Sequence, residues 1–91
     1  MKVLVLYRPN SEHGRVVEEF VRDLQRRVTS AATLEVMNVD SRDGSAIASL
    51  YDVMQYPAVL VLQTDGALHK FWQGTAEVPP LLDEVAGYAR A

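Results

Sequence analysis

The chain has 91 residues, of which 48% are hydrophobic, and its formal net charge is −3. This length supports one compact domain, residues 1–91, and the apolar share excludes a disordered chain. The small negative charge gives no general attraction to nucleic acid or to an anionic membrane, so we expect neither as a partner.

Two further features restrict the location and the chemistry. No apolar run approaches the roughly 18 residues that a membrane span needs, and the apolar stretch near the N-terminus is too short for the core of a signal peptide. We therefore expect a cytoplasmic protein. The chain contains no cysteine, which excludes a disulfide, a thiolate nucleophile and a cysteine-ligated metal.

The first two elements are a strand and a helix. Residues 2–7, KVLVLY, form an almost continuous apolar run that predicts a strand buried on both faces. Apolar residues at three- and four-residue steps then predict a helix over residues 11–28. Asn10 or Ser11 would cap it by accepting hydrogen bonds from the first free amides. The apolar stripe of this helix would consist of Val16, Val17, Phe20, Val21, Leu24 and Val28.

Several arginines on this helix raise the question of a nucleic-acid interface. Acidic residues alternate with them, and Asp23 stands four positions before Arg27, a spacing that favours ion pairs along a helix. The sequence therefore favours a solvated helix face over a basic patch.

A second strand and a short helix follow. Residues 29–33 read as a loop, and the alternating segment LEVMNVD predicts a strand over residues 34–40. The next residues, SRDGS, are typical of a turn that caps a helix. We expect this helix over residues 44–53. Its apolar stripe would consist of Ile47, Leu50, Tyr51 and Met54.

An antiparallel hairpin is predicted next. The segments AVLVLQ and ALHKFW are typical of strands, over residues 58–63 and 67–72. Residues 64–66, TDG, between them suit a tight turn. At the end of the hairpin, we expect one of Phe71 and Trp72 to face the core and the other to be partly exposed.

A helix that opens at Pro79 and Pro80 would complete the fold, because a missing N–H costs little in a first turn. Its buried stripe would be Leu81, Leu82, Val85 and Tyr88. The order is then β-α-β-α-β-β-α, with the first two strands parallel across a helical crossover. This predicts an α/β fold with a four-stranded mixed sheet and helices on both faces.

This order, with a proline at the start of the third strand, resembles the thioredoxin-like fold in its short, glutaredoxin-sized form. Three stretches carry the resemblance: VLVLYRPNSEHGRVVEEFVRDL, LEVMNVD and YDVMQYPAVLVLQTDGALHKFWQG. They are similar to the family's first strand, active-site loop and first helix, to its second strand, and to its segment from the second helix through the hairpin. The last stretch includes the family's cis-proline, so the resemblance implies a cis Tyr56–Pro57 bond.

The resemblance also locates a departure from the family. Redox members carry Cys-x-x-Cys or Cys-x-x-Ser at the start of the first helix. Here Ser11 lies at the first cysteine position, Glu12 and His13 lie between, and Gly14 lies at the second. A serine hydroxyl does not ionise near neutral pH and cannot form a mixed disulfide. We therefore expect no thiol–disulfide oxidoreductase activity and assign no catalytic residue.

In this family the backbone before the cis-proline pairs with an extended peptide or with glutathione. The resemblance thus implies a small groove bordered by Tyr56 and by the amides near Ser11, with Arg8 at its rim to pair with a carboxylate. The candidate binding residues are Arg8, Ser11, Glu12, His13, Gly14, Tyr56 and Pro57. The open alternative is that Pro57 only shapes the start of its strand.

Two other kinds of chemistry are weak candidates. Ser11, Glu12 and His13 have the letters of a hydrolytic triad, but three consecutive residues rarely place an acid, a base and a nucleophile in line. A helix cap is the favoured role for Ser11. His13 with Glu12, Asp40 or Asp43 is a weak metal signal, and a solvent-facing histidine is favoured. No metal or cofactor is expected.

The first functional interpretation is a redox-inactive thioredoxin-like domain that binds a protein or peptide noncovalently, at the groove or at the hairpin edge. The alternative is a glutathione- or small-thiol-binding protein or enzyme that uses the Ser11 hydroxyl. It is weakened because the acid–serine pair of glutathione transferases is absent where this chain reads GTAEVPP. A third alternative is a small thioredoxin-like regulator that lacks the cysteine pair and works by assembly.

Overall fold

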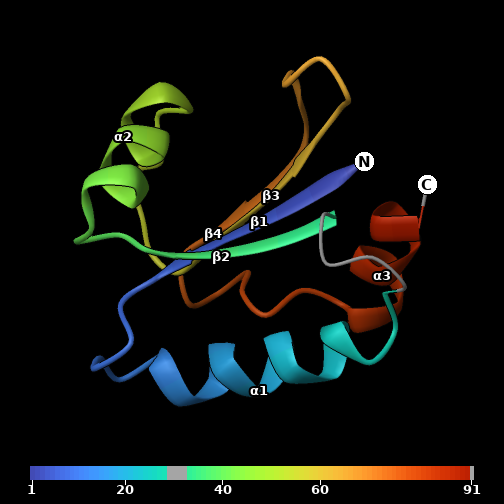
Figure 1. The fold of residues 1–91 in the computed structure, drawn as a ribbon. Coiled ribbons are helices and arrows are strands. Elements are labelled where there is room, and N and C mark those ends of the chain that lie inside the picture. Colours follow the sequence, from blue (N-terminus) through green and yellow to red (C-terminus); the bar gives the residue numbers. More distant parts are fainter. Residues whose placement is uncertain (29–32, 91) are drawn as a thin grey trace.

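The computed structural model describes residues 1–28 and 33–90, and its elements follow the predicted order (Figure 1). The elements are β1 (Lys2–Tyr7), α1 (Gly14–Gln25), β2 (Leu34–Asn38), α2 (Arg42–Leu50), β3 (Ala58–Leu62), β4 (Leu68–Gln73) and α3 (Leu82–Arg90). The sheet order is β2-β1-β3-β4, with β1 parallel to β2 and antiparallel to β3, and β3 antiparallel to β4. The predicted α/β fold with a four-stranded mixed sheet is confirmed. The loop predicted over residues 29–33 lies almost entirely outside the described residues.

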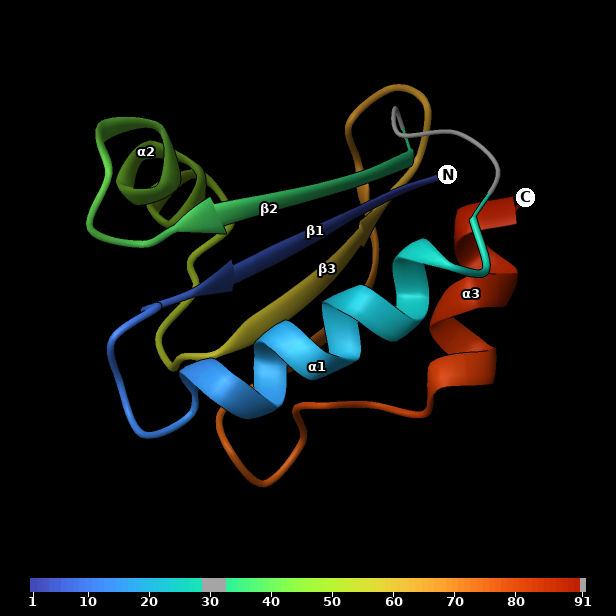
Figure 2. The same ribbon diagram turned by 60° about the horizontal axis from the view of Figure 1, so that its bottom comes forward.

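The sheet carries an apolar core on each face (Figures 1 and 2). Helices α1 and α3 cover one face and α2 covers the other. Because side chains alternate along a strand, neighbouring residues of β1 enter different cores. The residues toward α1 and α3 include Val3, Val5, Val59 and Val61, and those toward α2 include Leu4, Leu6, Leu60 and Leu62. Burial on both faces explains why β1 and β3 read as continuous apolar runs.

Helix α1 begins at Gly14 rather than at residue 11, because two turns precede it. The N–H of Ser11 donates to the Arg8 carbonyl at 3.2 Å, and the N–H of Gly14 donates to the Ser11 carbonyl at 3.1 Å. The prediction that Asn10 or Ser11 caps this helix is wrong. His13 takes the N-cap position, and its side chain makes no capping hydrogen bond.

Other boundaries also differ from the predictions. Helix α1 ends at Gln25, and β2 ends at Asn38, each before its predicted end. Helix α2 begins at Arg42, earlier than predicted, because the hydroxyl of Ser41 caps it by accepting a hydrogen bond of 3.0 Å from the Gly44 N–H. Ser41 is the first residue of SRDGS, the segment from which a capping side chain was predicted, so α2 begins inside that segment.

Four residues that were assigned to buried stripes are exposed. The exposed fractions are 48% for Val16, 70% for Leu50, 78% for Met54 and 76% for Leu81. Met54 follows the end of α2 and Leu81 precedes α3, so neither lies on a helix face. Leu50 is in the last turn of α2, and the buried face of α1 runs through Val17 instead of Val16.

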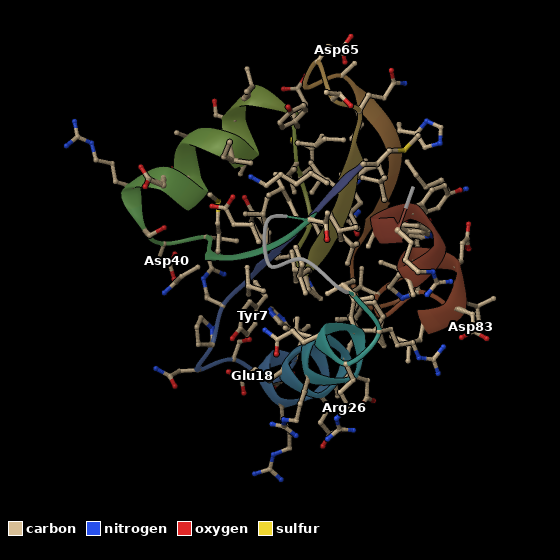
Figure 3. The ribbon with its side chains drawn as sticks, turned by 45° about the vertical axis from the view of Figure 1, so that its right-hand side comes forward. Tyr7, Glu18, Arg26, Asp40, Asp65 and Asp83 are labelled. Atoms are coloured by element: carbon tan, nitrogen blue, oxygen red, sulfur yellow. The ribbon has the colours of Figure 1, made fainter. Side chains whose placement is uncertain are left out.

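The ion pair predicted within α1 is replaced by two others. Asp23 pairs with Arg26 at 3.2 Å. Arg27, which follows α1, pairs with Asp83 at the start of α3, the residue labelled in Figure 3, so this pair joins the segments on one face of the sheet. The exposed face of α1 nevertheless carries both acidic and basic residues, as expected.

Strands β3 and β4 form the predicted hairpin, with Gly66 in its turn at a φ of +89°, a backbone angle that glycine adopts without a steric penalty. Phe71 packs against the core under α2, and Trp72 packs against the core under α1 and α3. The prediction that only one of the two faces a core is wrong, because helices cover both faces of the sheet.

Candidate functional site

The candidate residues lie on two connections and at the start of α1, and a third connection meets them at the same end of the sheet (Figure 2). Residues 8–13 connect β1 to α1, residues 51–57 connect α2 to β3, and residues 74–81 connect β4 to α3. The Gly74 N–H donates to the Pro57 carbonyl at 2.8 Å, which joins the last two connections. The start of β1 and the end of α3 lie at the other end of the sheet (Figures 1 and 2).

The segment before Pro57 is held from β4. The Tyr56–Pro57 bond is cis, as the resemblance implied, and Pro57 is fully buried. The side-chain oxygen Oε1 of Gln73 accepts hydrogen bonds from the N–H of Met54 at 3.1 Å and from the N–H of Gln55 at 3.2 Å. Within the described part of the chain, no hydrogen bond engages the N–H or the C=O of Tyr56. Tyr56 therefore offers an unpaired backbone donor and acceptor beside a fixed segment.

Arg8 connects two sides of this end of the sheet. Its Nε donates to Asp40 Oδ2 at 2.9 Å, and this hydrogen bond raises the pKa of Arg8 above its ordinary value. Its guanidinium carbon lies 5.8 Å from the ring centroid of Tyr56, within the range of a cation–π contact. Asp40, which follows β2, therefore pairs with the guanidinium that was expected to pair with a ligand carboxylate, and the ligand pairing stays a prediction. Both side chains are more than half exposed, so the pair adds little stability.

His13 holds the 8–13 connection together and is half-buried, so it is less exposed than the sequence indicated. Its Nε2 accepts a hydrogen bond of 3.2 Å from the Arg8 N–H, which places the proton of the neutral ring on Nδ1. Its ring centroid lies 6.4 Å from that of Tyr7. Burial lowers the pKa of His13 below 6.5, and the charge of Arg8 lowers it further.

Ser11 and Gly14 shape the connection. The Ser11 hydroxyl donates to the Arg8 carbonyl at 2.5 Å. A side chain at Gly14 would overlap the backbone oxygen of Pro9, so this position requires glycine. The serine–histidine pair of a hydrolase is not formed, because the Ser11 hydroxyl and His13 Nε2 are both bonded to backbone atoms of Arg8.

Two hollows at this end take the place of the single predicted groove. The first, of about 290 Å³, is lined by Glu12, His13, Val16, Thr75, Val78 and Pro79. The second, of about 340 Å³, is lined by Ser45, Ala48, Ser49, Asp52, Val53, Met54 and Tyr56. The candidates Glu12 and His13 thus face a different hollow from Tyr56, and Arg8 contacts both His13 and Tyr56.

Sequence reasoning missed two residues of this site. Gln73 holds amides 18 and 19 positions away, and no local pattern signals such a contact. Met54 was assigned to a buried helix face, although its side chain is exposed beside Tyr56. Pro57 ends the helical pattern, and its closeness to Met54 was the sequence signal that Met54 lies outside the helix.

The described residues also limit other kinds of site. No group of three or more histidine, aspartate or glutamate side chains in residues 1–28 and 33–90 is placed to hold a metal ion. Across the same residues, no helix has the length and apolar character that a bilayer crossing requires.

No protein-family model matches this chain, and no curated protein matches it. Its function must therefore be inferred from its own residues.

Proposed function

We propose that this chain is a redox-inactive, thioredoxin-like domain that binds an extended peptide noncovalently at the backbone of Tyr56. The observation that carries the proposal is the unpaired N–H and C=O of Tyr56, next to two amides that Gln73 holds in place. A peptide in the strand conformation would pair with Tyr56 by donating one N–H and accepting with one C=O. A protein without cysteine performs no thiol exchange at this position.

The two hollows suit the side chains of such a peptide. Successive side chains of an extended chain point to opposite sides, so neighbouring residues would reach different hollows. In one hollow the exposed Met54 lies beside Tyr56, and its unbranched thioether adapts to different apolar groups. In the other, the exposed Val16 lies beside Val78 and the neutral ring of His13.

Binding of glutathione at Ser11 has less support. The Ser11 hydroxyl proton is donated to the Arg8 carbonyl, and the Arg8 guanidinium is paired with Asp40. Asp40 already neutralises the Arg8 guanidinium, so a glutathione carboxylate would be attracted to it less strongly than to an unpaired arginine. Glutathione therefore serves as a competitor in the test of the peptide proposal.

The test is the affinity of a fluorescein-labelled hexapeptide of alternating valine and threonine, a composition that favours extended chains. Fluorescence anisotropy gives its dissociation constant. We expect Met54→Lys to weaken binding about tenfold, which corresponds to about 1.4 kcal/mol. Leu81→Lys is the matched control, because Leu81 is as exposed as Met54 and lines neither hollow.

Three outcomes would contradict the proposal. Equal weakening by both substitutions would indicate a nonspecific charge effect. Unchanged binding by Met54→Lys would indicate a different surface, such as the free edge of β4. Displacement of the peptide by glutathione, with tight glutathione binding that depends on Ser11, would support the thiol-ligand function instead.

A further inference from the structure

We propose that His13 is a proton-controlled latch for the peptide site, an inference that rests on the proposed function. The neutral ring holds the 8–13 connection closed and keeps Arg8 over Tyr56. Protonation of the ring releases this connection and weakens peptide binding.

The hydrogen bond between Arg8 and His13 exists only with a neutral ring. The Arg8 N–H donates to His13 Nε2 at 3.2 Å, and that nitrogen accepts through its one lone pair. When Nε2 takes up a proton it becomes a donor, and two donors then face each other. The bond cannot survive protonation, so the connection loses a contact between its first residue and its last.

Arg8 transmits this change to the peptide site. Its backbone N–H is bonded to His13, and its side chain is bonded to Asp40 and lies over the Tyr56 ring. A shift of the Arg8 backbone therefore moves the group that covers Tyr56. A protonated His13 would also place a second positive charge near the guanidinium, and this repulsion favours the same release.

The groups around His13 act on its charge state in opposite directions, and burial and the Arg8 charge outweigh the carboxylate of Glu12. From β1, Tyr7 contacts the ring, and its hydroxyl is committed to Glu18 of α1. Glu12 lines the same hollow as His13. Burial and the Arg8 charge lower the pKa of His13. The release therefore falls in the range below about pH 6.5.

The segment that faces His13 across the hollow adds no charge to its wall. The wall residues of the 74–81 connection are Thr75, Val78 and Pro79, which are uncharged. Glu77 of the same segment accepts a hydrogen bond of 3.0 Å from the Gln73 N–H. Arg8 is therefore the cation that controls the charge state of this ring, together with burial.

The first experiment follows the latch without any peptide. In an NMR pH titration of the free protein, we expect the backbone amide of Arg8 to change with the same midpoint as the His13 ring. In His13→Gln, whose amide oxygen can accept the Arg8 N–H without titrating, the Arg8 amide should stay unchanged over that pH range. His69→Gln is the control, because His69 is exposed on β4 and distant in the fold.

The second experiment measures the affinity of the valine–threonine hexapeptide at about pH 7.5 and about pH 5. We expect binding at the lower pH to be about fivefold weaker for the wild-type chain and for His69→Gln, with no such change for His13→Gln.

The outcomes separate the two proposals. If the Arg8 amide does not follow the His13 ring, or if the wild type and His13→Gln respond equally to pH, the latch is overturned. If the Arg8 amide follows the ring and no peptide binds at either pH, the peptide function fails while the local Arg8–His13 switch is established. A linked change of the Arg8 amide and of the affinity supports both.

Discussion

The hydroxyl of Tyr7 donates a hydrogen bond of 2.8 Å to Glu18 Oε2, which joins the end of β1 to α1 (Figure 3). The two residues lie on either side of the connection that carries Arg8 and His13. This bond therefore holds the elements on either side of the connection together, while the bond between Arg8 and His13 joins its first and last residues.

Removal of this hydroxyl should destabilise the fold. We expect Tyr7→Phe to lower the free energy of unfolding by about 1–2 kcal/mol, because a partly buried hydrogen bond to a carboxylate is lost. Urea denaturation measures the change. Tyr88→Phe is the matched control, because its hydroxyl bond to Glu84 is exposed and long, at 3.5 Å. Equal effects of the two substitutions would show that the Tyr7 bond contributes no more to the free energy of unfolding than the exposed Tyr88 bond does.

The same bond gives the stability a pH dependence at high pH. Burial raises the pKa of Tyr7 above 10.0, and the hydrogen bond and charge of Glu18 raise it further. Above about pH 10 the unfolded chain loses this proton while the folded chain retains it, so stability is lost as the pH rises. The wild type should lose more stability than Tyr7→Phe between about pH 9 and about pH 10.5. An equal loss in both proteins would contradict this assignment.

The fold and the site differ in how far they follow from the sequence. The continuous apolar runs of β1 and β3 and the turn at Gly66 are local patterns, and the elements that they predict are present. The buried faces of the helices were predicted less well, because Val16 and Met54 are apolar and yet exposed. Met54 is exposed because α2 ends before it, and Val16 is exposed because the buried face of α1 runs through Val17.

The site depends still more on contacts between distant segments. Ser11 and His13 were recognised as candidates from their positions, but their bonds to Arg8 decide what they do. The partners Asp40 and Gln73 come from other elements. Such pairings have no local sequence signal, so a single groove was predicted where two hollows are present.

Two glycines with opposite surroundings provide a stability test. Gly14→Ala should lower the free energy of unfolding by about 1–3 kcal/mol, because the new methyl group would overlap the backbone oxygen of Pro9. Gly87→Ala should raise it by about 0.5–1 kcal/mol, because Gly87 lies in α3 with open space around it. Thermal or urea denaturation of both variants measures these changes. A tolerated Gly14→Ala would mean that the connection before α1 can move away without cost.

Glycine at position 52, the residue after the C-cap of α2, should stabilise the fold. Asp52 has a φ of +55°, a left-handed angle that costs a residue with a side chain more than it costs glycine. We expect Asp52→Gly to raise the free energy of unfolding by about 0.5–1 kcal/mol and Asp52→Val to lower it. Denaturant unfolding of the two variants measures both effects. A loss of stability in Asp52→Gly would imply that the aspartate side chain has a partner in solution.

The lowered pKa of His13 predicts a pH dependence of stability in the acidic range. The unfolded chain takes up the histidine proton at about pH 6.5, while the folded chain resists it because of burial and Arg8. This contribution to stability is fully present above about pH 6.5 and decreases as the pH falls below that value. The free energy of unfolding should therefore fall more steeply in the wild type than in His13→Gln. Parallel pH profiles would show that His13 titrates equally in both states.

The most direct measurement for the peptide site is the amide NMR spectrum of the labelled protein during addition of the valine–threonine hexapeptide. We predict a downfield shift of the Tyr56 amide and its protection from exchange, because the peptide carbonyl accepts this N–H. The same peptide with every amide N-methylated keeps its carbonyls but cannot donate to the Tyr56 carbonyl, so it should fail to bind and leave the Tyr56 amide unchanged. An unchanged Tyr56 amide, with shifts confined to the edge strand β4 (Leu68–Gln73), would contradict binding at the Tyr56 backbone.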